Sequence, residues 1–144
     1  MPDRIATTHW SGSLFTGSGT IDLVSSRAGQ FTCSLSTRAG EPAGQTSPEE
    51  LIAAAHSACY SMQLSALLTA ANTPPERIDT TAAVSQKQRG EAYVITDSQL
   101  TVRAVVPGID ATTFRRTAEN AKNACPVSVA LQGVTITLDA ELEN

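Results

Sequence analysis

The sequence lacks several features that mark common functional classes. Its 14 acidic residues outnumber its 10 Lys and Arg residues, so the net charge is −4 and the isoelectric point is about 5.0. This balance argues against a nucleic-acid-binding surface. No apolar run looks long enough to span a bilayer, and the first ten residues lack the apolar core of a signal peptide. We therefore expect a cytoplasmic protein with neither nucleic acid nor membrane as a partner.

Residues that could carry chemistry are also few. The three cysteines are Cys33, Cys59 and Cys125, and none belongs to a Cys-x-x-Cys pair, so a zinc site has little support. The two histidines are His9 and His56. Because the cytoplasm keeps thiols reduced, its cysteines are more often buried, metal-binding or catalytic than joined in structural disulfides.

The chain does contain enough apolar material for a real core. Hydrophobic residues make up 41% of its 144 residues and charged residues 17%, which argues against disorder. It shows no internal repeat and no low-complexity segment. This length favours a single domain, which we expect to cover residues 1–144.

One long apolar helix is predicted to organise the fold. Ser47 is a natural N-cap, Pro48 fits the first helical position, and Glu50 completes a capping box. The Ala-rich run that follows should end near Pro74 and Pro75. A helix this apolar should be buried, with the rest of the fold around it. Residues spaced by three or four predict its shared face, and they are Leu51, Ala55, Cys59, Met62 and Ala66.

The rest of the chain is predicted as strands and one further helix. Composition and turn residues predict strands within residues 7–36 as an antiparallel meander, then a hairpin of 78–89 with 92–106, and a last strand from residue 134. Residues 37–46 read as a loop. Asp110 should cap a second helix over residues 111–124, with a further helical turn at 127–131. Separate antiparallel strands with helices packed on them predict an α+β fold.

Cys125 stands in a distinctive local context. Pro126 follows it, and proline favours the first turn of a helix. Cys125 is therefore expected where one helix ends and a short one begins, a position that stabilises a thiolate. Pro126 has no N–H, so Val127 and Ser128 would supply that stabilisation. The plainer alternative, which is stronger for Cys33, is a small buried hydrophobic residue.

Cys59 cannot be activated by its own helix. It lies in the middle of the helix, where the dipole helps little and burial raises the pKa of a thiol. A reactive Cys59 therefore needs a cation, and Arg27, Arg38, Arg103 or a lysine could supply it. Arg38 is the most attractive, because its segment leads straight into the helix and a guanidinium can hold a carboxylate bidentately while it faces a thiolate. The alternative for Arg38 is a solvated surface charge.

Glu49 is the carboxylate best placed to orient that arginine, because the capping box occupies Glu50. Ten residues of helix rise about 15 Å, so Glu49 cannot touch Cys59 of the same helix. A long arginine must bridge them, the preceding segment must fold back, or a second subunit must contribute. His56, three residues before Cys59, could form a Cys–His pair, although an exposed or hydrogen-bonded helical histidine is more common.

Four stretches of the chain form a recognisable combination: Thr16-Gly-Ser-Gly-Thr20, Thr37-Arg38, Thr46-Ser-Pro-Glu-Glu-Leu-Ile-Ala-Ala-Ala-His-Ser-Ala-Cys59 and Ala124-Cys-Pro-Val-Ser128. Together they resemble the OsmC/Ohr family of osmotically inducible protein C and organic hydroperoxide resistance proteins. The resemblance covers essentially the whole chain, and the first and third stretches are more similar to the OsmC branch.

This resemblance implies a thiol-dependent peroxidase that reduces organic hydroperoxides, and hydrogen peroxide less well. It implies antiparallel sheets around a long central helix, in an intertwined homodimer with two interfacial sites. Cys59 would be the peroxidatic and Cys125 the resolving cysteine, Arg38 would activate the thiolate, and Glu49 would position Arg38. Oxidised Cys59 would condense with Cys125, and an external dithiol would reduce the disulfide. No metal, haem, flavin or selenium is required.

Two other functions stay open from the residues alone. A long helix wrapped by antiparallel strands is also similar to acyl-thioester hydrolases, although the cysteine pair would then lack a role. A thiol redox sensor or binding module without turnover is the other alternative.

Overall fold

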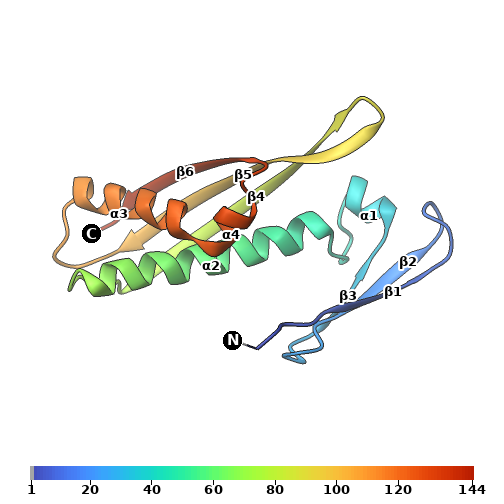
Figure 1. The fold of residues 1–144 in the computed structure, drawn as a ribbon, viewed down its shortest axis with the longest axis horizontal. Coiled ribbons are helices and arrows are strands. Elements are labelled where there is room, and N and C mark those ends of the chain that lie inside the picture. Colours follow the sequence, from blue (N-terminus) through green and yellow to red (C-terminus); the bar gives the residue numbers. More distant parts are fainter. Residues whose placement is uncertain (1) are drawn as a thin grey trace. The chain divides into compact units, whose positions relative to one another are not determined.

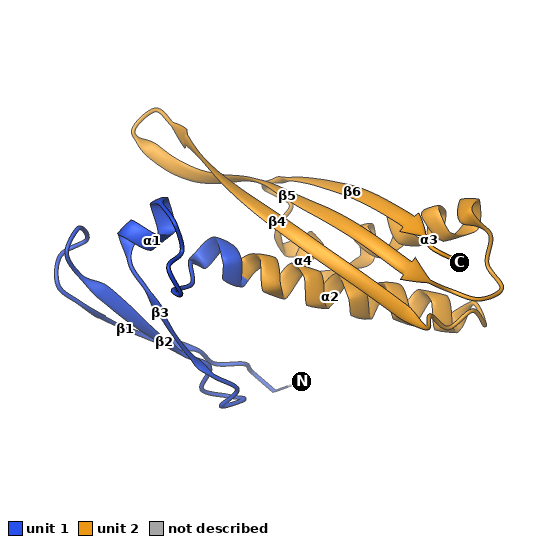
Figure 2. Cartoon of the chain, turned by 180° about the vertical axis from the view of Figure 1, so that it is seen from behind, with its two compact units in different colours: residues 1–51 blue, residues 52–144 orange. Residues whose placement is uncertain are grey.

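The computed structural model describes residues 2–144, which form six strands and four helices. In chain order they are β1 (Thr7–Ser11), β2 (Ser18–Asp22), β3 (Gln30–Cys33), α1 (Leu35–Ala39), α2 (Pro48–Ala70), β4 (Arg77–Arg89), β5 (Ala92–Val105), α3 (Ala111–Ala124), α4 (Pro126–Ala130) and β6 (Thr135–Leu142). The chain divides into two compact units, Met1–Leu51 and Ile52–Asn144 (Figure 2). The predicted α+β class is confirmed.

The first unit contains the predicted antiparallel meander, a sheet in the order β1-β2-β3. Its middle strand needs a glycine at position 19, which pairs with Trp10 on one side and Cys33 on the other. A Cβ atom at Gly19 would lie 2.9 Å from the Cys33 sulfur and 3.0 Å from the Trp10 ring. The glycine therefore leaves room for the Cys33 sulfur and the Trp10 ring to pack against the strand.

A short helix precedes α2 where the sequence predicted a loop. Ser34 caps α1, because its side chain accepts a hydrogen bond from the Thr37 backbone N–H at 3.4 Å. The prediction of a loop from residue 37 was wrong for the three residues up to Ala39, since one serine cap suffices to start a single helical turn. Arg38 is consequently held on a helix.

The second unit contains a sheet in the order β4-β5-β6 (Figure 1). β4 and β5 form the predicted hairpin, which turns at Gly90 with φ of +62°. β6, however, pairs with β5 in parallel, so the expectation of antiparallel strands was wrong for this strand. The reason is the connection: α3 and α4 lie between β5 and β6 in the chain, and a helical crossover returns the chain to a parallel position.

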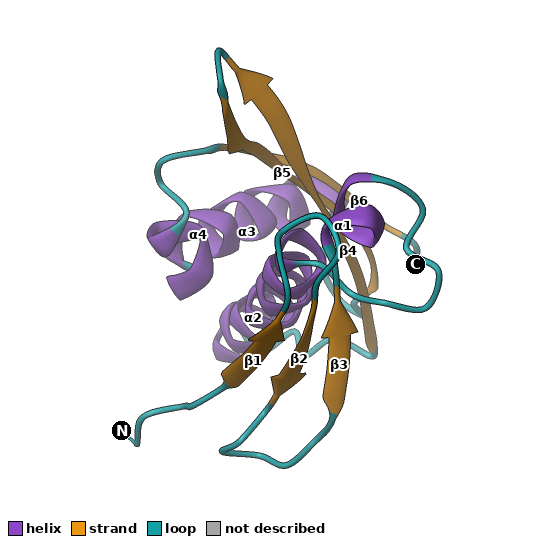
Figure 3. Ribbon diagram, turned by 90° about the vertical axis from the view of Figure 1, so that its right-hand side faces the viewer, coloured by secondary structure: helices purple, strands orange, loops and turns teal. Residues whose placement is uncertain are grey.

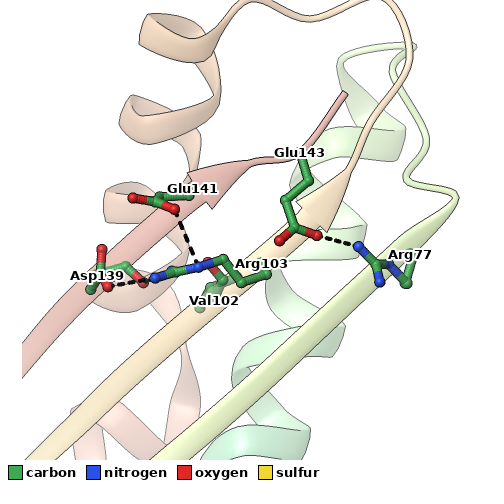
Figure 4. Close-up of polar contacts among 6 residues, drawn as sticks. All are labelled: Arg77, Val102, Arg103, Asp139, Glu141 and Glu143. Carbon is green, nitrogen blue, oxygen red and sulfur yellow. Dashed lines mark hydrogen bonds and ion pairs between the residues drawn. The ribbon is translucent and has the colours of Figure 1, made fainter.

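Ion pairs across the strands mark the sheet face opposite the helices (Figure 4). Arg103 of β5 pairs with Asp139 at 2.9 Å and with Glu141 at 3.3 Å, both on β6. Arg77 at the start of β4 pairs with Glu143, just after β6. These largely exposed pairs join all three strands and favour the observed parallel register, in which Arg103 lies directly opposite Glu141.

The other face of this sheet carries the core, beneath α2 and α3 (Figures 1 and 3). Side chains of β5 alternate, and its even-numbered residues from Thr96 to Ala104 point inward. The fully buried apolar residues come from α2, from β5 and its end, and from α3 and its end; they are Tyr60, Leu64, Leu68, Leu100, Val102, Ala104, Val106, Phe114, Ala118, Ala121 and Cys125.

The buried face of α2 differs from the prediction. Its buried residues are His56, Tyr60, Leu64 and Leu68, one per turn. The residues predicted to share that face lie partly or fully exposed, and Met62 is 67% exposed. Because α2 is apolar on nearly every side, the spacing of apolar residues alone does not predict which face packs on the sheet. The buried face is the one that carries the large side chains of His56, Tyr60, Leu64 and Leu68.

The length of α2 also overturns one expectation. By length and composition, Pro48–Ala70 would suffice to cross a membrane, whereas the sequence had suggested no such run. The core helix of a soluble protein meets the same criterion, so this property alone is weak evidence for a membrane.

Replacement of Phe114 by alanine tests the core of the second unit. We expect Phe114→Ala to lower the free energy of unfolding by about 3–5 kcal/mol, because it empties a fully buried site. Arg115→Ala, on the exposed side of the same helix, should change it by less than about 0.5 kcal/mol. Urea unfolding followed by circular dichroism measures both, and equal losses would contradict this packing.

Candidate functional site

Two cysteines far apart in the sequence meet in the second unit. Cys59 lies half-buried in the middle of α2, and Cys125 is fully buried between α3 and α4. Both are free thiols, and they lie close enough for Cys125 to raise the pKa of the Cys59 thiol. The predicted position of Cys125, at the end of one helix and the start of a short one, is confirmed.

The start of α4 contributes directly to Cys59. The backbone N–H of Val127 lies near the Cys59 sulfur and lowers the pKa of that thiol. The sequence had predicted this N–H and that of Ser128 as donors to Cys125, and the effect of Val127 on Cys59 was not foreseen. Proline at 126 leaves Val127 as the first residue of α4 with an N–H to give.

Within its own unit, Cys59 is not an activated thiol. Burial raises its pKa most strongly, the Val127 N–H lowers it, and the neighbouring Cys125 thiol raises it again, so that the net shift is upward. A thiol with a raised pKa is mainly protonated at neutral pH and a poor nucleophile. This direction agrees with the expectation that Cys59 needs a cation.

The first unit holds the predicted arginine–glutamate pair. Arg38 donates from Nη2 to Glu49 Oε1 at 2.6 Å and from Nε to Oε1 and Oε2 at 3.2 and 3.1 Å. The Glu49 side chain is only 12% exposed. The pair therefore has the bidentate geometry that fixes a guanidinium in one orientation.

The pair also keeps both groups charged. Burial pushes the pKa of Glu49 upward, but hydrogen bonds from Arg38, from its own backbone N–H and from Ser47 outweigh it, so that the pKa is lowered. The hydrogen bond to Glu49 raises the pKa of Arg38. Glu49 is thus a permanent carboxylate and Arg38 a permanent cation.

Glu50 is engaged in hydrogen bonds at the start of α2, as predicted, although only one of the two hydrogen bonds of a capping box is present. The Glu50 N–H donates to Ser47 Oγ at 3.1 Å. The Glu50 carboxylate accepts instead from Thr46 Oγ1 at 2.5 Å. Glu49 is therefore the first-turn carboxylate left for Arg38.

His56 follows the hydrogen-bonded alternative and not the Cys–His pair, with partners that the sequence did not reveal. It is fully buried, with Nδ1 at 2.7 Å from Ser98 Oγ and Nε2 at 2.9 Å from Ser128 Oγ. Burial lowers the pKa of its imidazole. Both ring nitrogens are thus engaged with serines, which leaves neither for a Cys–His pair with Cys59. No local spacing could have signalled partners that stand 42 and 72 residues away.

The predicted residues therefore form two pairs, one in each unit. Arg38 and Glu49 belong to Met1–Leu51, and Cys59 and Cys125 to Ile52–Asn144. A half-buried thiol beside a buried one can be oxidised first and then joined to its neighbour in a disulfide.

A family model and several known proteins match this chain over most of its length. The family model described as OsmC-like protein matches residues 40–139. Peroxiredoxin OsmC from Escherichia coli (strain K12) is 43% identical over 136 residues, which cover 94% of each chain. Peroxiredoxin OsmC from Shigella flexneri is similar to the same extent.

Solved structures agree on the fold. An organic hydroperoxide resistance protein OsmC from Legionella pneumophila has a TM-score of 0.75 at 20% identity, over 98% of each chain. Organic hydroperoxide resistance protein OhrB of Bacillus subtilis has a TM-score of 0.68 at 22% identity, over 96% of this chain and 98% of its own. With a family model that matches more than half of its length and a relative at 43% identity, this chain belongs to the OsmC family.

Proposed function

We propose that this chain is a thiol-dependent peroxidase that reduces organic hydroperoxides, and hydrogen peroxide less well. The observation that carries the proposal is the adjacency of the half-buried Cys59 thiol and the buried Cys125 thiol. The name peroxiredoxin belongs to a relative at 43% identity, and organic hydroperoxide resistance is the name of proteins with the same fold.

The reaction follows from the two thiols. The Cys59 thiolate attacks the O–O bond of the hydroperoxide, the alcohol leaves, and Cys59 becomes a sulfenic acid. The Cys125 sulfur then attacks the sulfur of Cys59, and the hydroxyl leaves as water with the Cys125 proton. The product is a Cys59–Cys125 disulfide. A dithiol reductant returns both cysteines to thiols by disulfide exchange.

Arg38 is proposed to activate Cys59, and Glu49 to position Arg38. Glu49 binds the Nε and Nη2 edge of the guanidinium, which leaves the Nη1 side for the thiolate and for the charge that develops on the peroxide oxygen. Such a cation would offset the raised pKa of Cys59. Ten helical residues between Glu49 and Cys59 rise about 15 Å, so Arg38 either bridges them or acts on the partner subunit of a homodimer.

The homodimer is proposed from the unpacked side of α2. Opposite its buried face, exposed residues form a continuous stripe of small and apolar side chains, and they are Ala55, Ala58, Met62, Ala66 and Thr69. Only 22% of the most apolar stretch of this helix is buried. A second copy of α2 on this stripe would remove the apolar surface from water.

Two further expectations belong to the same proposal. We take the two compact units to act as a single OsmC-like domain over residues 1–144. We also place the enzyme in the cytoplasm, where its three free cysteines would remain reduced between turnovers.

Replacement of Cys59 and replacement of Cys125 should block different steps of the reaction. Cys59→Ser should abolish consumption of cumene hydroperoxide in the presence of a dithiol, because the nucleophile is lost. Cys125→Ser should still be oxidised once at Cys59 but should not form an intramolecular disulfide. Cys33→Ser is the matched control and should keep wild-type turnover. Activity that survived Cys59→Ser would overturn the assignment.

The Arg38 variant tests the activation of the thiol. Arg38→Ala should raise the pKa of Cys59 by about one unit or more, and so lower kcat/KM at neutral pH by about tenfold or more. Glu49→Gln keeps the size but removes the charge that orients Arg38, and should cost less. Alkylation of Cys59 by iodoacetamide against pH measures this pKa; Arg116→Ala, an exposed arginine, is the control. An unchanged pKa in Arg38→Ala would contradict the role.

A charge placed on the α2 stripe tests the dimer. Met62 is 67% exposed in the single chain, so Met62→Glu should leave a monomer folded. In a homodimer joined through α2 it would bury a carboxylate, and the mass measured by sedimentation equilibrium should fall from two chains to one. Wild-type protein that sediments as a single chain would contradict the homodimer.

A further inference from the structure

A buried histidine remains outside the proposed reaction. His56 lies on α2, three residues before Cys59, and bonds Ser98 of β5 through Nδ1 and Ser128 of α4 through Nε2. All three side chains are at least 95% buried. A buried polar cluster of this kind is costly unless every member is satisfied, and here both ring nitrogens have partners.

The bond to Ser128 is the side-chain tether of α4. This helix has only five residues, and no side chain caps its start. Among residues 2–144, the Ser128 hydroxyl makes the one side-chain hydrogen bond that joins α4 to another element. A cavity of about 270 Å³ lies beside it, lined in part by Ser128, Val129, Gln132 and Ile136. Because a cavity and not a layer of packed side chains lies on that side of α4, the position of α4 depends more on the hydrogen bond between Ser128 and His56.

The same short helix carries the contacts that matter for the thiols. Cys125 immediately precedes α4, and its carbonyl oxygen accepts from the Val129 N–H at 3.0 Å. Val127, one residue before Ser128, has its N–H near the Cys59 sulfur and lowers the pKa of that thiol. Any shift of α4 along α2 would move both the Cys125 thiol and this N–H away from Cys59.

We propose that His56 is a positioning residue that, through Ser128, holds α4 against α2 so that the Cys125 thiol and the Val127 N–H stay beside Cys59. This inference rests on the proposed peroxidase function. The step it serves is the condensation, in which Cys125 attacks the Cys59 sulfenic sulfur, the S–O bond breaks, and the hydroxyl leaves as water with the Cys125 proton.

His56 acts in its neutral form. One ring nitrogen donates to a serine hydroxyl and the other accepts from the second serine, so either tautomer satisfies the cluster. The carboxylates on α2, β5 and α3 all have partners: Glu49 pairs with Arg38, Asp97 with Lys87 and Glu119 with Lys122, and Glu50 accepts from Thr46 at the start of α2. None is a free counter-ion for an imidazolium, and burial accordingly lowers the pKa of His56.

The two serines provide a matched pair of variants. Ser128→Ala removes the tether to α4, whereas Ser98→Ala removes a hydrogen bond from the same histidine without touching α4. Ser128→Thr keeps the hydroxyl. In each protein, cumene hydroperoxide is added without reductant, and rapid quenching with mass spectrometry follows the conversion of Cys59 sulfenic acid to the Cys59–Cys125 disulfide. Alkylation against pH gives the pKa of Cys59.

Ser128→Ala should slow disulfide formation by about three- to tenfold, the effect of one lost hydrogen bond, and should raise the pKa of Cys59. Ser98→Ala should stay within about twofold of wild type, and Ser128→Thr should recover most of the rate. Equal slowing by both alanine variants, or none by Ser128→Ala, would overturn the positioning role. If wild-type Cys59 is not oxidised at all, the peroxidase function itself fails.

Discussion

The meeting of Cys59 and Cys125 depends on how the second unit packs one face of its sheet. β5 and β6 run parallel, so the chain between them must cross over, and α3 and α4 form that crossover above the same face that α2 covers. The junction of the two crossover helices, Cys125, is thereby buried beside the middle of α2. An antiparallel β6 could follow β5 through a short turn, and the helices that meet at Cys125 would then not be needed. The chemistry of the site thus follows from strand topology.

The two units carry groups of different charge: neutral thiols lie in the second unit and an arginine–glutamate ion pair lies in the first. The second unit brings the thiols together but raises the pKa of Cys59, because burial and a second thiol outweigh one backbone N–H. The first unit contains a cation in a defined orientation, because Glu49 accepts two hydrogen bonds from the Arg38 guanidinium and both groups are ionised. Under the proposed role of Arg38, the Cys59 thiol would stay protonated until this cation reaches it.

Much of this was predictable from the sequence. Capping and breaking signals located α2 and α3 closely, because Ser47, Asp110 and the prolines act locally. The resemblance to a family singled out Cys59, Cys125, Arg38 and Glu49. The parallel pairing of β6, by contrast, depends on the path of the crossover, and the buried face of α2 on packing among nearly equivalent apolar sides.

The polar cluster of His56 was beyond local reasoning for a different reason. Its partners Ser98 and Ser128 are ordinary residues in their own segments, and only tertiary packing makes them the two neighbours of one imidazole. A buried histidine that bonds two elements beside a reactive pair is recognisable in a structure. In a sequence it looks like any histidine on a helix.

In the proposed reaction, a hydroperoxide joins Cys59 to Cys125 within one chain. Reduced wild-type protein can be titrated with cumene hydroperoxide in the absence of a reductant, and its peptides mapped by mass spectrometry. We expect that one equivalent of hydroperoxide is consumed per chain, two thiols disappear, and a Cys59–Cys125 disulfide forms while Cys33 stays free. Consumption of hydroperoxide without that disulfide, or pairing of Cys59 with Cys33, would contradict it.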